Sequence, residues 1–179
     1  MSTFDSGPLA DVHARTDGDA RTLVLTRELR HPPERVWAAL TEPGQIAAWA
    51  PYTADRDLAR TGGATLTMID GDTRVPLDAT VTEVDPPRLL GYTWGGDRLR
   101  WELEPTGDGT RLTLRHTTPD PEMLAKAAAG WHLCLRVAER LLDGDPIPPI
   151  RGSQALEYGW QELHDAYAAR LGVSEAGRA

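Results

Sequence analysis

The spacing of apolar residues changes several times along the chain, and each change predicts a different element. Residues 1–20 are rich in Asp, Gly, Ser and Thr and show no hydrophobic period, so we expect a flexible tail there. From Arg21 to Leu29 apolar and polar residues alternate, which predicts a strand. Pro33 suits the first turn of a helix over residues 33–42. The segment QIAAWA, residues 45–50, predicts a second short helix.

Five further alternating segments are separated by turn residues. They are ATLTMI, TRVPLDATVTEV, RLLGYTW, RLRWELE and TRLTLRHTT. Consecutive strands joined by tight turns are antiparallel neighbours, so the pattern predicts a meander with one buried face. Val84 is out of phase with the apolar residues before it, which predicts a β-bulge near Thr82 and Glu83.

A long amphipathic segment follows the strands. Between about residues 122 and 143 an apolar stripe recurs at helical spacing, made of Leu124, Ala127, Trp131, Cys134, Leu135, Ala138, Leu141 and Leu142. A helix of about 20 residues spans about 30 Å and can cover the apolar face of a sheet, which two short helices cannot. After a connector with three prolines, a last amphipathic helix is predicted over residues 153–171. We therefore expect an α+β fold, in which about six to seven antiparallel strands curve around the long helix.

Length and composition favour a single domain in three parts. The 179 residues are enough to bury a core without a disulfide or a metal. We expect the flexible tail over residues 1–20, the main domain over 21–145, and a proline-rich connector with a helix packed on the same domain over 146–173.

The net charge, the cysteine content and the length of the apolar runs limit which partners and which cellular location we expect. The formal net charge is -8, and an acidic surface repels phosphate, so we do not expect nucleic acid as a partner. Cys134 is the only cysteine, which fits a reducing compartment. No apolar run approaches 18 residues and no secretory signal opens the chain, so we expect no membrane span and a cytoplasmic location.

Four segments together resemble a known family. HPPERVWAALTEPGQIAAWAPY, VTEVDPPRLLGYTW, GDGTRLTLRHTT and GWHLCLRVAERLLDG are similar, in this order, to START-like (SRPBCC) domains of the kind named for the C-terminal domain of the activator of heat-shock protein 90 ATPase. The resemblance covers about residues 22–144. It implies a helix-grip fold, in which the sheet grips the long helix around a hydrophobic cavity. The superfamily includes lipid carriers, hormone receptors and polyketide cyclases, so the fold alone does not select a function.

Motifs for common catalytic chemistry are absent from the sequence. The histidines are never paired at metal-ligand spacing, so we expect no metal, and the lack of a glycine-rich phosphate loop or a G-x-S-x-G motif argues against a bound cofactor or a serine nucleophile. His116 is the most suggestive polar residue, because it shares an inward strand face with Leu112 and Leu114. It is either a histidine at the rim of the cavity with satisfied hydrogen bonds or a group that contacts ligand or transfers a proton. Its candidate partners for acid–base chemistry are His132 and a carboxylate such as Asp78, although Asp78 should point outward by alternation. No catalytic residue is assigned.

The aromatic residues suggest that the protein binds a small hydrophobic ligand. Tyr92, Trp94, Trp101 and Trp131 are expected to converge on one space, where they either fill the core or line a cavity. The residues expected to contact a ligand are Met68, Tyr92, Trp94, Trp101, His116, Trp131, Cys134 and Leu135. We expect a monomer or homodimer that binds a small hydrophobic molecule, aromatic or lipid-like. The alternatives are a stress-related module that binds a chaperone and an enzyme of the cyclase or dehydratase type.

Overall fold

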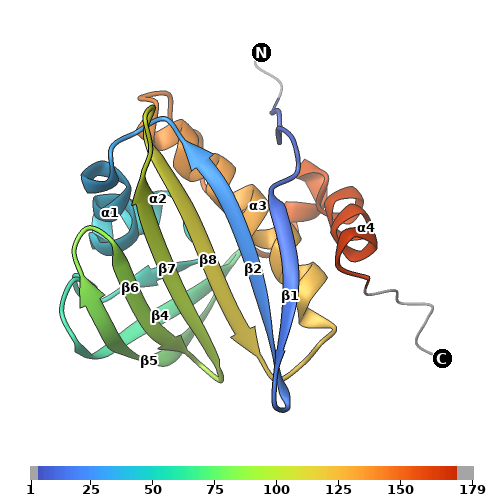
Figure 1. Cartoon of the computed structure of the whole chain (residues 1–179), viewed down its shortest axis with the longest axis horizontal. Helices are drawn as coiled ribbons and strands as arrows, with labels where there is room; N and C mark the ends of the chain where they lie inside the picture. Colours follow the sequence, from blue (N-terminus) through green and yellow to red (C-terminus); the bar gives the residue numbers. More distant parts are fainter. Residues whose placement is uncertain (1–3, 173–179) are drawn as a thin grey trace.

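A computed structural model describes residues 4–172, which form one antiparallel sheet and a set of helices that cover its inner face (Figure 1). The strands are β1 (Asp11–Asp17), β2 (Ala20–Leu29), β3 (Tyr52–Ala54), β4 (Gly62–Asp70), β5 (Thr73–Asp85), β6 (Leu89–Trp94), β7 (Asp97–Pro105) and β8 (Thr110–Thr118). The helices are α1 (Pro33–Thr41), α2 (Pro43–Trp49), α3 (Met123–Leu142), the 3-10 helix η1 (Gly152–Tyr158) and α4 (Trp160–Leu171).

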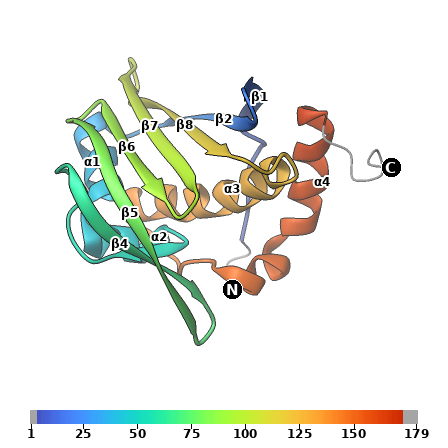
Figure 2. The same cartoon turned by 90° about the horizontal axis from the view of Figure 1, so that it is seen from below.

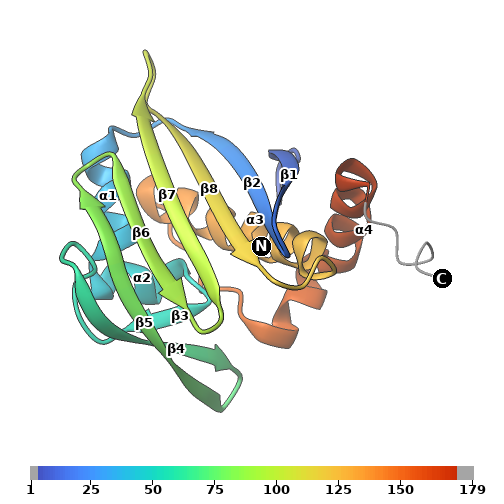
Figure 3. The same ribbon diagram turned by 60° about the horizontal axis from the view of Figure 1, so that its bottom comes forward.

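The sheet has the order β1-β2-β8-β7-β6-β5-β4-β3, and every neighbouring pair is antiparallel. The strands from β4 to β8 form the expected meander, and β2 joins it by pairing with β8. The sheet curves around α3, while α4 packs against α3 and β1 (Figure 2, Figure 3). The predicted helix-grip fold is therefore confirmed, with eight strands where six to seven were expected.

The prediction of a flexible N-terminal tail is wrong for the part that the structure describes. Residues 11–17 form β1, which pairs with β2 from Asp11 opposite Thr26 to Asp17 opposite Ala20. Before it, Ala10 is buried and Leu9 packs against the core. The strand was missed because it is held by backbone hydrogen bonds at a sheet edge, where polar side chains show no hydrophobic period. Residues 1–3 of the predicted tail lie outside the described residues.

The structure confirms the predicted bulge in β5 but divides the predicted C-terminal helix in two. The expected bulge in β5 is confirmed, since the pairing of β5 with β6 shifts between Val81 and Glu83. The single helix expected over residues 153–171 is instead divided into η1 and α4. Gly159 separates them with a φ of 87°, a left-handed conformation that glycine adopts without steric strain. The short strand β3 was not predicted, because three residues are too few to show an alternating pattern.

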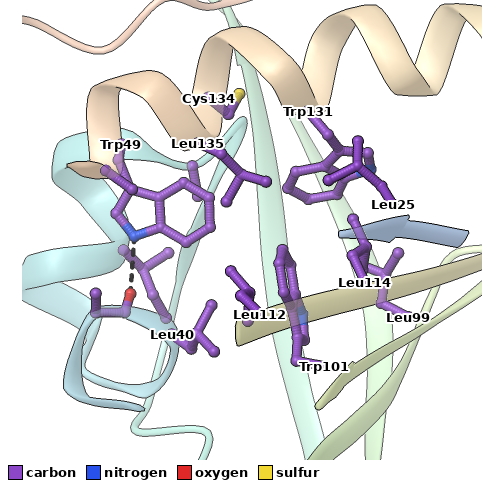
Figure 4. Close-up of a cluster of buried hydrophobic side chains, with 14 of the residues drawn as sticks. Leu25, Leu40, Trp49, Leu99, Trp101, Leu112, Leu114, Trp131, Cys134 and Leu135 are labelled. Atoms are coloured by element: carbon purple, nitrogen blue, oxygen red, sulfur yellow. Dashed lines mark hydrogen bonds between the residues drawn. The ribbon is translucent and has the colours of Figure 1, made fainter. Parts of the chain in front are cut away.

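The core lies between the sheet and α3 (Figure 4). Trp101 of β7 and Leu114 of β8 pack beneath Trp131 of α3, and Trp49 of α2 closes the side of this cluster. The Trp49 indole N–H donates to the Ala39 carbonyl oxygen at 2.8 Å, so its polar edge is satisfied inside the core. Much of the space inside the sheet is thus filled by side chains.

Candidate functional site

A pocket of about 470 Å³ lies beside this core, between the sheet and α3. Three parts of the chain build most of it, and Pro51, between α2 and β3, also lines it. The sheet contributes one residue from each of five successive strands, Met68, Leu77, Trp94, Asp97 and His116. The helix α3 contributes residues spaced three or four apart, chiefly Met123, Lys126, Ala127, Gly130, Trp131 and Cys134. The segment after α3 closes the remaining side with Ile150, Gly152, Ala155 and Trp160.

Five of the eight residues predicted to contact a ligand line this pocket, namely Met68, Trp94, His116, Trp131 and Cys134. Tyr92, Trp101 and Leu135 do not line it, because they are buried in the adjoining core. The Trp101 indole N–H donates to the Tyr92 hydroxyl oxygen at 3.0 Å, and the Tyr92 and Tyr52 hydroxyls are hydrogen-bonded to each other. The polar ends of these two aromatic residues are therefore occupied within the protein.

His116 is held on both ring nitrogens. The Trp131 indole N–H donates to Nδ1 at 3.0 Å, and an indole N–H can only donate, so Nδ1 is the acceptor. The proton must then sit on Nε2, which donates to the Asp97 carboxylate at 2.7 Å. With both nitrogens engaged, the neutral imidazole has no free lone pair for a substrate proton. His116 forms a fixed wall of the pocket, and Asp78 is exposed, as alternation predicted.

The buried thiol and phenol groups beside the pocket are also neutral. Burial raises the pKa of the Cys134 thiol to about 12, so this thiol is protonated at neutral pH, as expected for an inert core cysteine. Burial likewise raises the pKa of Tyr92 to about 12 and that of Tyr52 well above its ordinary value. The apolar end of the pocket therefore offers no anionic nucleophile.

Trp94 has an unusual environment. Its ring lies 5.9 Å from Trp131 and 5.1 Å from Tyr52, measured between ring centroids, and Trp131 also lines the pocket. Among the described residues the Trp94 indole nitrogen is buried and has no hydrogen-bond partner. A buried donor without a partner costs free energy, so this N–H marks a point where the protein leaves a polar group unused.

The connector after α3 is fixed to α2. The Arg151 guanidinium donates to the carbonyl oxygens of Ala50 and Ala47, at 3.0 Å and 2.8 Å. These carbonyls end α2, where no further backbone donor of the helix can reach them. Arg151 thereby holds its neighbours Ile150 and Gly152 in place as the third wall of the pocket.

Sequence reasoning missed Lys126 and Gly130, although both carry a signal. Lys126 is the only lysine in the chain, and Gly130 lies in the middle of α3, where glycine is destabilising. Apart from its chain neighbours and the backbone of its own helix, a methyl group added at Gly130 would have no atom within 4 Å. Because Gly130 lines the pocket, this empty space is pocket space.

Within the described residues, no group of three or more His, Cys, Asp or Glu side chains could hold a metal ion. Between residues 4 and 172, none of the helices is both long and apolar enough to cross a membrane.

Comparison with known proteins places the chain in a family. Residues 30–143, more than half of the chain, match the family model described as activator of Hsp90 ATPase homolog 1-like protein. No curated protein matches the sequence. CalU16 from Micromonospora echinospora is 26% identical in its crystal structure, with 89% of this chain and 95% of that chain covered and a TM-score of 0.66.

Two further solved structures are similar over a smaller share of this chain. MLL2253 from Mesorhizobium loti is 29% identical, with 71% of this chain and 100% of that chain covered and a TM-score of 0.61. NE0264 from Nitrosomonas europaea is 25% identical, with 73% and 99% covered and the same TM-score. The predicted START-like resemblance is confirmed, and the chain belongs to the activator of Hsp90 ATPase homolog 1-like family.

Proposed function

We propose that the protein binds a small hydrophobic molecule, aromatic or lipid-like, in the pocket between the sheet and α3. The observation that carries this proposal is the makeup of the pocket. Its volume of about 470 Å³ suits a small organic ligand, and apart from the protonated Cys134 thiol only Asp97, His116 and Lys126 among its lining residues are ionisable. Trp94 and Trp131 offer aromatic faces to a flat ligand.

Binding would be driven by burial of apolar surface. Each Å² of apolar area removed from water contributes about 25 cal/mol, from which the cost of immobilising the ligand is subtracted. Hydrogen bonds of His116 and Arg151 already hold the walls of the pocket in place. Ordering these walls on binding should therefore cost little free energy. The sheet wall and the α3 wall together act as a preformed slot.

The proposal is tested with N-phenyl-1-naphthylamine, a neutral aromatic dye that becomes fluorescent when it leaves water. We expect saturable binding to the wild type. Gly130→Leu places an isobutyl group in the empty space beside the helix, so it should weaken binding by at least about tenfold. Gly130→Ala is the matched control, because it adds one methyl group, should keep binding, and should stabilise α3 by about 0.5–1 kcal/mol.

Circular dichroism and urea unfolding show whether both variants fold. If the wild type failed to bind the dye, or if a folded Gly130→Leu bound it as tightly as the wild type, the proposal would be wrong. Binding that is lost equally in Gly130→Leu and Gly130→Ala would also contradict it, because one methyl group does not fill the pocket.

A further inference from the structure

We propose that the natural ligand is amphipathic and anionic, with an apolar body in the pocket and a carboxylate, sulfonate or phosphate group paired with Lys126 at the rim. This inference rests on the proposed function and names the ligand class of the same site. The juxtaposition that carries it is the only lysine of the chain beside an otherwise mainly apolar pocket whose His116 and Trp131 nitrogens are already hydrogen-bonded within the protein.

Lys126 is placed on α3 where its ammonium can meet a bound molecule. It lines the pocket together with Gly130, which is one helical turn further along, and Trp131. Five residues along a helix correspond to about 7.5 Å, the axial distance from Lys126 to the aromatic wall at Trp131. Lys126 is exposed, so its charge is solvated in the absence of ligand, and no carboxylate among the described residues forms an ion pair with it.

The ring nitrogens of His116 and Trp131 are already hydrogen-bonded within the protein. The Asp97 carboxylate accepts a hydrogen bond from His116 Nε2, and the Trp131 indole N–H donates to Nδ1 of the same ring. The Lys126 ammonium is the one cationic side chain that lines the pocket, whereas the Trp94 indole nitrogen is too deeply buried to reach a bound molecule. An ammonium can only donate hydrogen bonds. A ligand that complements Lys126 must therefore supply an acceptor, and an anionic oxygen group is the strongest acceptor that an ammonium can meet.

The charge of the whole molecule makes the role of Lys126 specific. With a formal net charge of -8, the protein repels anions at long range, so it has no general affinity for them. Asp97 adds a negative charge on the sheet side of the pocket. Within this pocket an anionic group is thus favoured only near Lys126, which fixes the ligand with its charged end at the rim and its apolar end against Trp131.

Two dyes with the same aromatic skeleton test this inference. 8-Anilinonaphthalene-1-sulfonate carries a sulfonate, and N-phenyl-1-naphthylamine lacks it. We expect Lys126→Gln to weaken binding of the sulfonate dye by about tenfold and to leave binding of the neutral dye within about twofold. Lys126→Arg keeps the charge and should keep both affinities within about threefold.

The sole lysine permits a second measurement on the same protein. An amine-reactive reagent can modify only Lys126 and the amino terminus of the chain, and peptide mass spectrometry distinguishes the two sites. Saturating sulfonate dye should slow modification of Lys126 several-fold relative to the amino terminus, and the neutral dye should not.

The outcomes separate the two proposals. If both dyes bind the wild type but Lys126→Gln leaves the sulfonate dye unaffected, or if Lys126 is not protected, the anionic ligand class is wrong and the apolar pocket stands. If neither dye binds the wild type, the proposed function itself fails. Equal loss of both dyes in a folded Lys126→Gln would also overturn the inference, because the lysine would then support the pocket rather than recognise charge.

Discussion

At the scale of single residues, hydrogen bonds fix the protonation state of His116. Trp131 donates to one ring nitrogen and Asp97 accepts from the other, so the imidazole is neutral and immobile. A protonated ring would place two donors, Trp131 Nε1 and His116 Nδ1, against each other. This arrangement suits a binding wall better than a general base, which needs an open lone pair.

The pair Asp97→Asn and Asp97→Ala tests this assignment. The amide oxygen of Asn can still accept from His116 Nε2–H, so Asp97→Asn should change the free energy of unfolding by less than about 1 kcal/mol. Asp97→Ala leaves the N–H of a buried ring without a partner and should cost about 1–3 kcal/mol. Urea unfolding at pH 7.5 measures both. Equal losses in the two variants would mean that the negative charge of Asp97, and hence a protonated His116, matters.

The sequence predicts on which side of a strand a site residue lies, but not whether that residue reaches the pocket or is buried in the adjoining core. Alternation placed Tyr92 and Trp94 on one face of β6, and both do point inward. Only Trp94 reaches the pocket, because the curvature of the sheet and the packing of α2 decide where the core is filled. Lys126 was overlooked because the apolar stripe of α3 predicts which side chains are buried, but not which charged residue beside the stripe lies at the pocket.

At the scale of elements, one hydrogen-bond network joins the N-terminal segment to two helices. His132 of α3 bonds through Nδ1 to the Tyr167 hydroxyl of α4 at 2.6 Å, and through Nε2 to the Ser6 carbonyl oxygen at 2.6 Å. The Ala10 backbone N–H donates to the same Tyr167 hydroxyl at 2.8 Å. Since a carbonyl only accepts, Nε2 carries the proton, and neutral Nδ1 accepts from Tyr167. These contacts hold the segment before β1 against α3 and α4.

Removing one oxygen from this network should destabilise the protein. Tyr167→Phe keeps the buried ring and leaves His132 Nδ1 and the Ala10 N–H unpaired, so we expect a loss of about 1–3 kcal/mol. Tyr158→Phe removes the hydroxyl of an exposed tyrosine and should change stability by less than about 0.5 kcal/mol. Chemical denaturation of the three proteins measures the difference. If Tyr167→Phe were as stable as Tyr158→Phe, the network would not hold the N-terminal segment.

The same histidine makes stability depend on pH. Burial lowers the pKa of His132 from its ordinary value of 6.5, and the nearby charges of Arg27 and Arg136 lower it further, against the opposing hydrogen bond to Ser6. The unfolded chain then binds the proton more readily than the folded one. The free energy of unfolding should therefore fall as the pH drops through about 6.5, until the folded pKa is reached.

Urea unfolding between pH 7.5 and 5 measures this loss. His132→Gln should flatten the profile in this window, whereas His13→Gln, at an exposed position of β1, should leave the profile as in the wild type. A wild-type slope that persists in His132→Gln would assign the pH dependence to another group.

At the scale of the whole molecule, the predictable part of the fold is the part that buries an apolar face. The meander and α3 alternate between buried and exposed positions at their proper periods, so the sequence was enough to place them. The edge strands β1 and β3 and the connector after α3 were not predictable in this way. The two strands are held by backbone pairing with β2 and β4, which imposes no pattern on the side chains. The connector is held by Arg151, which contacts carbonyl groups about 100 positions earlier in the chain.

Ligand binding should be visible as a change in global stability. A molecule that binds only the folded state raises the free energy of unfolding by about 2.7 kcal/mol at 100 times its dissociation constant. For a chain of this size that corresponds to a rise in Tm of roughly 5–10 °C. Differential scanning fluorimetry with the neutral dye should show this rise in the wild type and Gly130→Ala. A rise of the same size in Gly130→Leu would place the binding site elsewhere.

The packing of the tryptophans gives the protein an internal optical reporter. Trp131 lies 5.3 Å from Trp101, 5.9 Å from Trp94 and 6.4 Å from Trp49, between ring centroids. At such separations excitation energy passes rapidly from one indole to the next, so the four rings emit as a coupled group. Two of them, Trp94 and Trp131, border the pocket. A quencher or energy acceptor bound in the pocket would reduce the fluorescence of all four tryptophans. Ligand binding to the pocket could therefore be followed by the intrinsic fluorescence of unlabelled protein.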